Sequence, residues 1–254
     1  VVLAAIVWRA CMRRTTFIAI TGSLGKTTAK DCLASMLSSA GPTIKTIGND
    51  NGRRGLPRTI LRVRPWHRYA VVEVGTDSPG KMIRSSLTVR PDVVVVLNVA
   101  RTHTQAYRDL DHIAIEKSRL MRFMRPRGVV VLNAGDERVR RMRAPGAQRV
   151  VHFGAQPESA MRAEDVISEW PGRLEFTAVS GGERCRVRTQ LTGRHWLDCA
   201  LAGLTVAQAL GVSLEAAAEK LATLTPYTGR LSPWPLANGA TVLRDDYNGS
   251  VDSF

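Results

Sequence analysis

The chain has 254 residues, 44% of them hydrophobic, and shows neither low-complexity stretches nor internal repeats. These values exclude a disordered or fibrous protein and suit a globular one. The net charge is +14, but the basic residues are scattered without interleaved aromatics, so we expect a generally basic surface and no nucleic-acid partner. The four cysteines show no metal-ligand spacing and are expected to be reduced thiols.

Residues 1–14 form an apolar and basic lead segment. The run from Val1 to Trp8 is apolar, and Arg9, Arg13 and Arg14 follow it. A bilayer-spanning helix needs about 20 apolar residues, so the run is too short to span on its own. Because the chain starts at Val, one interpretation is the end of a membrane helix that holds a cytoplasmic protein at the inner face of the membrane. The other interpretation is an amphipathic or buried segment.

Strand-like and helix-like segments alternate over the first 150 residues. The segment 92–99 is apolar on both faces, which is typical of the centre of a parallel sheet covered by helices. The alternation predicts an α/β parallel sheet with right-handed crossovers. Strands are expected at 16–21, 43–47, 69–74, 92–99, 128–133 and 150–154, helices at 26–39, 79–87 and 110–124, and a Gly- and Asn-rich loop at 48–57.

The pattern changes after residue 150. Residues 174–191, with Gly181-Gly182 in the middle, resemble an antiparallel hairpin. Helices are expected at 195–210 and 214–224. The Pro- and Gly-rich segment 226–235 reads as a linker, and a strand at 241–244 would open a further domain that the chain does not complete.

A glycine-containing loop stands between the first strand and the first helix of the sheet. Its sequence is Thr21-Gly22-Ser23-Leu24-Gly25-Lys26-Thr27-Thr28. Backbone N–H groups and a helix N-terminus at such a place bind phosphates, Lys26 can reach the β- and γ-phosphates, and the Thr27 hydroxyl can bind Mg²⁺. Ile20 departs from the strict pattern, so an ordinary glycine turn is the alternative.

Several motifs in sequence order resemble those of the Mur ligase family. The glycine loop resembles their phosphate loop, and segments 48–61 and 73–80 resemble those of the members that add D-Ala-D-Ala. Further matches are Asn98-Val99 with His103, Ile115-Glu116-Lys117, Gly193-Arg194-His195, Gly229-Arg230 and Asp245-Asp246-Tyr247-Asn248. The chain is therefore identified as similar to the central ATP-binding domain of this family, over nearly its whole length from Thr15.

The resemblance implies roles for individual residues. It implies catalytic roles for Lys26, Lys117, His103 and Asn49. It implies contacts to ATP from Gly22, Ser23, Leu24, Gly25, Lys26, Thr27, Thr28, Asn51, His195, Arg230 and Asp246. It implies Mg²⁺ binding by Thr27, Glu73, His103 and a carbamylated Lys117. The chemistry agrees for Thr27 and Glu73, because Mg²⁺ prefers oxygen ligands and ligands of α/β sheets bind at carboxyl strand ends. The alternatives are a salt-bridged acid at Glu73, a solvated His103, a surface Lys117 and turn-forming asparagines.

The resemblance implies a P-loop NTPase-like, mostly parallel sheet flanked by helices, with a small antiparallel hairpin and the start of a C-terminal Rossmann-like domain. The expected domains are the lead segment 1–14, the ATP-binding domain 15–228 and the beginning of a C-terminal ligase domain at 229–254. The implied activity is ATP-dependent joining of a small-molecule carboxylate to an amine through an acyl phosphate, in peptidoglycan precursor synthesis. The chain alone is expected to bind ATP with little ligation.

Departures from the family pattern leave alternatives open. Trp196 and Cys199 stand where the family has Asn near adenine, and Gly52, Lys81 and Ser250-Val251 also differ. The manner of adenine binding and the identity of both substrates therefore stay open. The alternatives are a membrane-associated poly-γ-glutamate synthetase-like ligase, a P-loop ATPase or kinase, and a binding module without chemistry.

Overall fold

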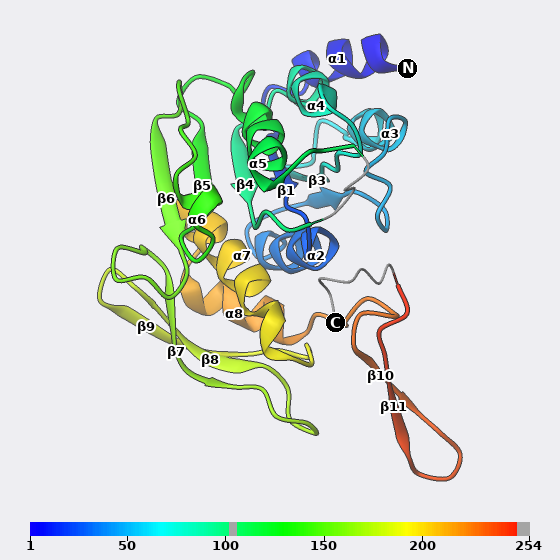
Figure 1. Cartoon of the computed structure of the whole chain (residues 1–254), viewed down its shortest axis with the longest axis vertical. Coiled ribbons are helices and arrows are strands. Elements are labelled where there is room, and N and C mark those ends of the chain that lie inside the picture. Colours follow the sequence, from blue (N-terminus) through cyan, green and yellow to red (C-terminus); the bar gives the residue numbers. More distant parts are fainter. Residues whose placement is uncertain (102–105, 248–254) are drawn as a thin grey trace.

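A six-stranded parallel sheet lies at the centre of the structure, a computed structural model that describes residues 1–101 and 106–247 (Figure 1). The strand order is β2-β3-β1-β4-β5-β6. The strands of this sheet are β1 (Thr16–Thr21), β2 (Thr43–Lys45), β3 (Tyr69–Glu73), β4 (Val93–Val96), β5 (Val129–Asn133) and β6 (Arg149–Phe153).

Apolar residues on both faces of the strands explain why helices cover the sheet on two sides. In β1, Phe17 and Ala19 belong to one buried cluster, whereas Ile18 and Ile20 belong to the other. The parallel register sets Ile20 opposite Glu73 and Thr21 opposite Val96. The carboxyl ends of β1, β3 and β4 therefore meet at one edge of the sheet.

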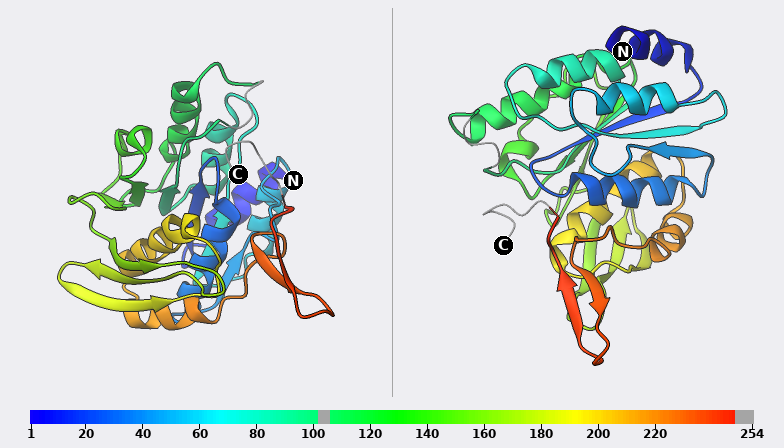
Figure 2. Two further views of the ribbon diagram at one scale, coloured as in Figure 1. Left: turned by 60° about the horizontal axis from the view of Figure 1, so that its bottom comes forward. Right: turned by 90° about the vertical axis from the view of Figure 1, so that its right-hand side faces the viewer.

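Helices α1, α3, α4 and α5 cover the face of Phe17, and α2 and α7 cover the face of Ile18 (Figures 1 and 2). Helix α8 packs beside α2 on this second face. The helices are α1 (Val2–Cys11), α2 (Lys26–Leu37), α3 (Gly55–Arg62), α4 (Lys81–Val89), α5 (Leu110–Ser118), α6 (Glu137–Arg140), α7 (Leu197–Ala209) and α8 (Leu214–Ala222), with 3-10 turns η1 (Arg119–Met121) and η2 (Arg194–Trp196).

Two smaller antiparallel sheets complete the structure. One has the order β7-β8-β9, from β7 (Arg162–Ile167), β8 (Glu175–Ser180) and β9 (Glu183–Arg188). The other is the hairpin of β10 (Ser232–Pro235) and β11 (Thr241–Arg244), which projects away from the main body (Figures 1 and 2).

The parallel α/β fold predicted from the sequence is confirmed, and several of its elements differ from the prediction. The predicted loop 48–57 is wrong at its end, because α3 begins at Gly55. The predicted helix 110–124 ends as an α-helix at Ser118, and η1 continues it. The predicted hairpin gains a third strand, β7, and β10 occupies the end of the predicted linker.

The lead segment forms α1, which packs on α3 and α4. Its Arg9 side chain is buried, donates to the carbonyls of Val89 (2.7 Å) and Arg90 (2.8 Å), and forms an ion pair with Asp92 at 2.9 Å. Among the described residues, no helix has the length and apolar character needed to cross a membrane.

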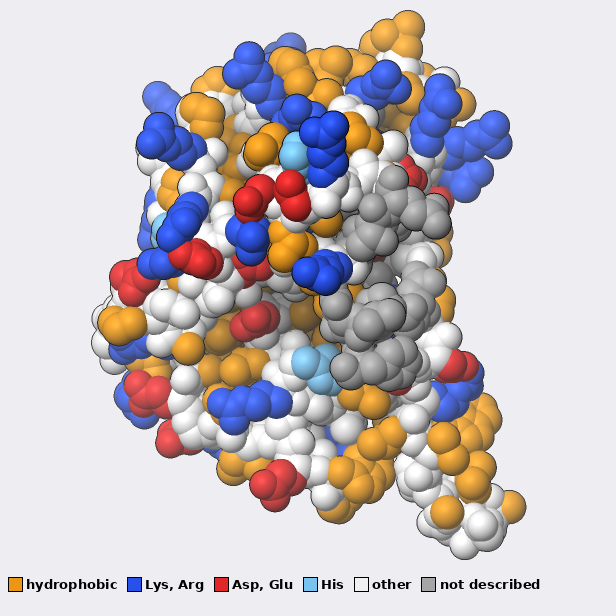
Figure 3. Space-filling view, in the orientation of Figure 1, with side chains coloured by type: hydrophobic (Ala, Val, Ile, Leu, Met, Phe, Trp, Pro, Cys, Tyr) orange, Lys and Arg blue, Asp and Glu red, His pale blue; other side chains and the backbone are white. Residues whose placement is uncertain are grey.

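On the face of the molecule seen in Figure 3, the positive charge is dispersed. Figure 3 shows Lys and Arg side chains spread over the view, with Asp and Glu side chains among them in most regions. This distribution agrees with the scattered positions of the basic residues along the sequence.

Candidate functional site

The loop between β1 and α2 is held open by polar contacts from the strand beside it. The backbone N–H of Leu24 donates to Asn98 Oδ1 at 2.8 Å, and Asn98 Nδ2 donates to the Leu24 carbonyl at 3.2 Å. The Ser23 hydroxyl donates to the Ala100 carbonyl at 3.0 Å and accepts from its N–H at 2.9 Å. Asn98 and Ala100 follow β4, so the neighbouring strand fixes the shape of the loop.

Gly25 at the N-cap of α2 leaves no room for a larger residue. Its φ is +78°, and a Cβ atom there would lie 2.9 Å from the Cys199 sulfur. The Cys199 thiol donates to the Gly25 carbonyl at 3.4 Å, and burial raises the pKa of this thiol well above its usual value. Helix α7 is therefore packed directly behind the loop.

Lys26, the first residue of α2, folds back over this loop. Its Nζ donates to the carbonyls of Gly22 at 3.0 Å and Ser23 at 2.9 Å. Burial lowers the pKa of Lys26; the charge of Glu73 opposes that shift and the charge of Arg230 adds to it. An ammonium beside loop N–H groups at a helix N-terminus is an anion-binding arrangement.

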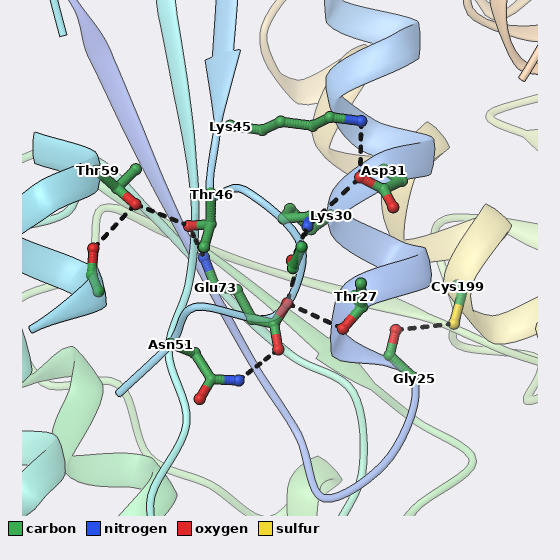
Figure 4. A network of polar contacts seen from close by, with 12 residues as sticks. Gly25, Thr27, Lys30, Asp31, Lys45, Thr46, Asn51, Thr59, Glu73 and Cys199 are labelled. Carbon is green, nitrogen blue, oxygen red and sulfur yellow. Dashed lines mark hydrogen bonds and ion pairs between the residues drawn. The ribbon is translucent and has the colours of Figure 1, made fainter. Parts of the chain in front are cut away.

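Glu73, the last residue of β3, is 1% exposed and is surrounded by donors (Figure 4). The Thr27 hydroxyl donates to its Oε2 at 3.0 Å, and Asn51 Nδ2 donates to its Oε1 at 2.6 Å. The Glu73 N–H donates to the Thr46 hydroxyl at 3.0 Å. The structure thus brings together three of the predicted site residues, Thr27, Asn51 and Glu73. Thr28, which follows Thr27 in the first turn of α2, is also buried.

Lys30 is a member of this network that the sequence interpretation missed (Figure 4). Its buried ammonium lies 4.0 Å from Glu73 Oε2 and 3.5 Å from Asp31 Oδ1, and it donates to the Gly48 carbonyl. Burial lowers the pKa of Lys30, against the charges of Asp31 and Glu73. The available signal was its spacing of one helical turn after Lys26, which puts both ammonium groups on the same side of α2.

Lys117 lies on α5 and is 2% exposed. Burial lowers its pKa to about 7, and the nearby positive charge of Lys26 contributes to that shift. The adjacent Glu116 is also buried and accepts hydrogen bonds from the Met82 N–H at 2.9 Å and from Arg119 at 2.6 Å, which fixes the helix. Lys117 is therefore a buried amine rather than a surface lysine, and much of it is neutral near pH 7.

Arg230 and His195 come from the C-terminal part of the chain. The influence of Arg230 on the pKa of Lys26 places its charge near the loop, and its guanidinium lies 5.0 Å from the centre of the Tyr247 ring. The exposed His195 stacks at a tilt on Trp196, with 4.4 Å between ring centres. Burial lowers the pKa of His195, and Asp245 opposes this shift.

Two further predicted residues, Asp246 and Asn49, are not joined to this network. Asp246 is exposed and pairs with Arg244 at 2.7 Å. The Asn49 side chain has no hydrogen bond within the described part of the chain, although its carbonyl accepts from the Asn51 N–H at 2.6 Å. His103 and Asn248 lie outside the described residues.

A second polar pair, also missed, lies at the same edge of the sheet. Asn133, the last residue of β5, donates from Nδ2 to Asp198 Oδ2 at 2.9 Å. Burial raises the pKa of Asp198, which stands in the first turn of α7. Only the tertiary fold joins these residues, which are 65 positions apart in the sequence.

Protein side chains alone do not form a complete metal site in the described structure. Within residues 1–101 and 106–247, no group of three or more His, Cys, Asp or Glu side chains is arranged to hold a metal ion. The hydroxyl of Thr27 and the carboxylate of Glu73 are nevertheless adjacent oxygen ligands. This pair suits Mg²⁺, which keeps several waters and takes further oxygens from phosphates.

Comparison with known proteins agrees with this geometry. The family described as "Mur ligase middle domain" matches residues 20–207, which include the glycine loop, Glu73 and Lys117. The UDP-N-acetylmuramoyl-tripeptide–D-alanyl-D-alanine ligase of Escherichia coli (strain K12) is 31% identical over 237 residues, covering 93% of this chain and 52% of that protein. The ligase of the same name from Borreliella burgdorferi is 34% identical over 243 residues, covering 93% and 50%. The chain thus spans about half the length of these curated relatives.

Solved structures show the same similarity in three dimensions. A crystal structure of MurF from Acinetobacter baumannii has a TM-score of 0.91 and 30% identity, covering 98% of this chain and 54% of that one. MurF ligase from Thermotoga maritima, solved in complex with ADP, has a TM-score of 0.86 and 25% identity, covering 99% and 58%.

Proposed function

The chain belongs to the Mur ligase family, and from this membership we propose that it binds ATP with Mg²⁺ and forms the phosphoryl-transfer centre of an ATP-dependent carboxylate–amine ligase. The observation that carries the proposal is the position of the Lys26 ammonium and the Thr27–Glu73 oxygen pair. Both stand beside the glycine loop, at the carboxyl edge of a parallel sheet. Phosphoryl transfer depends chiefly on such positioning and charge neutralisation.

The glycine loop orients the triphosphate. Backbone N–H groups of residues 25–28, at the N-terminus of α2, face the β- and γ-phosphates, and Lys26 exchanges its carbonyl partners for phosphate oxygens. Arg230 adds a second positive charge near the same position. Asp246 and His195 are assigned to the nucleoside end of ATP on the family resemblance.

Thr27 and Glu73 are the residues that would hold Mg²⁺, which supplies neutralisation of phosphate charge when bound. Glu73 is already oriented for this task. The hydrogen bond from Asn51 fixes its carboxylate, and the hydrogen bond from its N–H to Thr46 fixes its main chain. Thr27 must turn its hydroxyl proton away from Glu73 so that the oxygen of each residue is free as a ligand.

Lys117 is suited to carbamylation, which the family resemblance implies. A neutral amine attacks CO₂, and a pKa of about 7 makes the neutral form abundant at physiological pH. The product is an anion, so the repulsion between Lys117 and Lys26 becomes an attraction. We assign carbamylated Lys117 and His103 to a second Mg²⁺, and Asn49 to the acyl phosphate.

The proposed reaction has two steps. An oxygen of the substrate carboxylate attacks the γ-phosphorus, and ADP leaves. The amine then attacks the carbonyl carbon of the acyl phosphate, loses a proton, and expels inorganic phosphate to leave an amide. Lys26 holds the transferred phosphate in line during the first step and neutralises the charge that develops on it.

We further propose that the carboxylate comes from a UDP-N-acetylmuramoyl-tripeptide and the amine from D-alanyl-D-alanine, in peptidoglycan precursor synthesis. The names of the relatives and the motifs in residues 48–61 support this choice of substrates.

The test is ADP release by the full-length protein. Repeated turnover should require both the carboxylate and the amine, and Lys26→Ala should lower it by about 10³-fold because the phosphate loses its closest cation. Lys220→Ala, at an exposed position of α8, is the matched control and should be unaffected. Continuous ADP release without the carboxylate substrate would support a plain ATPase instead, and normal turnover by Lys26→Ala would refute the mechanism.

A further inference from the structure

The strands of the parallel sheet begin at the edge opposite the glycine loop, which we call the amino edge. Because all six strands are parallel, the segments that lead into them lie along this edge. We define the amino edge by five segments: 13–15 before β1, 64–68 before β3, 90–92 before β4, 125–128 before β5, and 148–149 at the start of β6.

Backbone hydrogen bonds join these segments into one continuous surface. The Thr16 N–H, at the start of β1, donates to the Arg68 carbonyl at 2.9 Å. The Arg125 N–H donates to the Pro91 carbonyl at 2.9 Å. The Gln148 N–H donates to the carbonyl of Gly128, the last residue before β5, at 3.0 Å. The surface extends across five neighbouring strands, a width of about 20 Å.

The amino edge is strongly basic. Its segments contain eight arginines and one acidic residue, which leaves on this edge seven of the net positive charges that give the chain its +14. The arginines are Arg13, Arg14, Arg64, Arg68, Arg90, Arg125, Arg127 and Arg149, and all except Arg125 are exposed. The fold therefore gathers arginines that lie far apart in the sequence.

The acidic residue of this edge, Asp92, does not neutralise the exposed arginines. It pairs with the buried Arg9 at 2.9 Å and lies 3.7 Å from Arg125. Within residues 1–101 and 106–247, the other seven arginines of the amino edge have no acidic partner within 4.0 Å. Their guanidinium groups are available to an anionic partner, and phosphate groups match their geometry well.

Trp66 adds an exposed aromatic ring to this basic surface. Its side chain is 68% exposed. The turn that carries it is held in place, because the His67 N–H donates to the Arg64 carbonyl at 2.9 Å and the Arg64 N–H donates to His67 Nδ1 at 2.9 Å. The Thr15 hydroxyl donates to the His67 carbonyl at 2.7 Å and joins this turn to the start of β1. Tryptophan rings are enriched at membrane–water interfaces, at the level of the lipid headgroups.

The composition and shape of the amino edge favour lipid over nucleic acid. Proteins that bind single strands stack successive bases on several aromatic rings. The five segments contain one tryptophan and neither tyrosine nor phenylalanine. Readout of duplex DNA uses a helix or a β-ribbon that enters a groove, whereas these segments are the short connections before strands. A broad row of arginines with one indole ring instead matches a surface of many anionic headgroups.

We propose that the amino edge docks the protein on an anionic membrane surface. The exposed arginines lie against lipid phosphates, and the Trp66 ring inserts among the headgroups. In this orientation, the glycine loop at the opposite edge of the sheet faces away from the bilayer and stays open to ATP from the water. The membrane contact is separate from the phosphoryl-transfer centre, so each can be tested without the other.

The test is co-sedimentation of the full-length protein with phosphatidylcholine vesicles that contain phosphatidylglycerol, compared with pure phosphatidylcholine vesicles. Wild type should bind the anionic vesicles in preference, and binding should weaken as salt rises because exposed charges are screened. The double variant Arg14→Glu/Arg127→Glu should lower the partition coefficient by about 100-fold, since each basic residue near an anionic surface contributes about fivefold. Trp66→Ala should lower it by about fivefold, because less apolar area is buried in the interface.

The matched control is the double variant Arg184→Glu/Arg188→Glu, which makes the same charge change at exposed positions of β9, outside the amino edge. It should bind anionic vesicles as wild type does. Circular dichroism should show that all variants are folded. Their ADP release in the absence of vesicles should equal that of wild type, because the substituted residues lie away from the glycine loop.

The inference is overturned if wild type does not bind anionic vesicles, if it binds neutral vesicles equally well, or if Arg14→Glu/Arg127→Glu binds as wild type does. It is also overturned if an oligonucleotide, followed by fluorescence anisotropy, displaces the vesicles and loses its binding in that variant, because the occupant would then be a nucleic acid. Normal ADP release alongside any of these results would leave the proposed function standing. Vesicle binding without ADP release would contradict the ligase and support the membrane contact.

Discussion

Glu73 illustrates how single side chains define the site. Its carboxylate accepts from Thr27 and Asn51 and lies 4.0 Å from the Lys30 ammonium, all at the end of one buried strand. The proximity of Thr27 and Glu73 could be predicted from the sequence. Glu73 ends a strand, Thr27 lies at the start of a helix, and both positions are at the same edge of the sheet. For Lys30, the sequence shows only its position one helical turn after Lys26. Its burial could not be predicted, because it depends on the packing of α2 against the loop that contains Gly48.

Replacing Lys30 with Met should destabilise the protein by about 3 kcal/mol, because Glu73 and Asp31 would lose a buried cation. The control is Lys45→Met. Lys45 also pairs with Asp31, at 2.7 Å, but its side chain is 44% exposed, so we expect a cost below about 1 kcal/mol. Urea unfolding followed by circular dichroism measures both. Equal costs for the two variants would contradict the central position of Lys30.

Lys117 should make stability depend on pH. Its folded-state pKa of about 7 lies below its ordinary value of 10.5, so the unfolded chain binds the proton more tightly between these values. The cost of burying the charge is therefore complete below pH 7 and is relieved as the pH rises toward 10.5. This shift could not be predicted from the sequence, because it comes from burial and from the proximity of Lys26 in the fold.

Lys117→Met should accordingly be more stable than wild type at pH 6, by about 4 kcal/mol, with the difference shrinking toward pH 10. Urea unfolding at both pH values measures it, and Lys220→Met, at an exposed position, should show no such trend. A constant difference between Lys117→Met and wild type across this range would show that Lys117 is not a buried, titrating amine.

Helix α1 is the element for which the sequence left two interpretations open. Its apolar run suggested either the end of a membrane helix or an amphipathic or buried segment. In the structure, the buried Arg9 joins this helix to the parallel sheet. The guanidinium lies 3.9 Å from the centre of the Phe17 ring and pairs with Asp92, which also accepts from the Phe17 N–H at 2.9 Å. One arginine thus links α1 to the starts of β1 and β4. Burial lowers its pKa to about 10.

Arg9→Met should destabilise the protein by about 3 kcal/mol or more, because Asp92 would lose its ion-pair partner in a partly buried position. Arg13→Met, at an exposed position just after the helix, is the matched control and should change stability by less than about 0.5 kcal/mol. Thermal or urea unfolding distinguishes them. Similar stabilities would mean that α1 does not depend on this ion pair.

At the scale of the whole molecule, the strands of the parallel sheet were predictable because they are short apolar runs bounded by turns. Helix α3 was missed because its eight residues contain Gly55 and Pro57, which are typical of loops. Strand β7 was missed because its residues are only half-buried or exposed, and β10 because it contains two prolines. These elements are stabilised by pairing and packing rather than by their own pattern.

The residues of the candidate site also divide into those that the sequence could predict and those that it could not. The glycine loop and the strand-end residues could be predicted, because strand order brings their positions to one edge. The Asn133–Asp198 pair and, at the opposite edge, the gathering of arginines on the amino edge could not, because they depend on side chains from elements far apart in sequence. Both features exist only where these elements pack together in the folded protein.

The most direct test of the account is a crystal structure of the protein with Mg²⁺ and a non-hydrolysable ATP analogue. We expect the β- and γ-phosphates in the loop of residues 22–25 within hydrogen-bond distance of Lys26, and Mg²⁺ in contact with Thr27 or Glu73. A loop without phosphate density, or a metal bound away from Glu73, would contradict the assignment of this edge of the sheet as the phosphoryl-transfer centre.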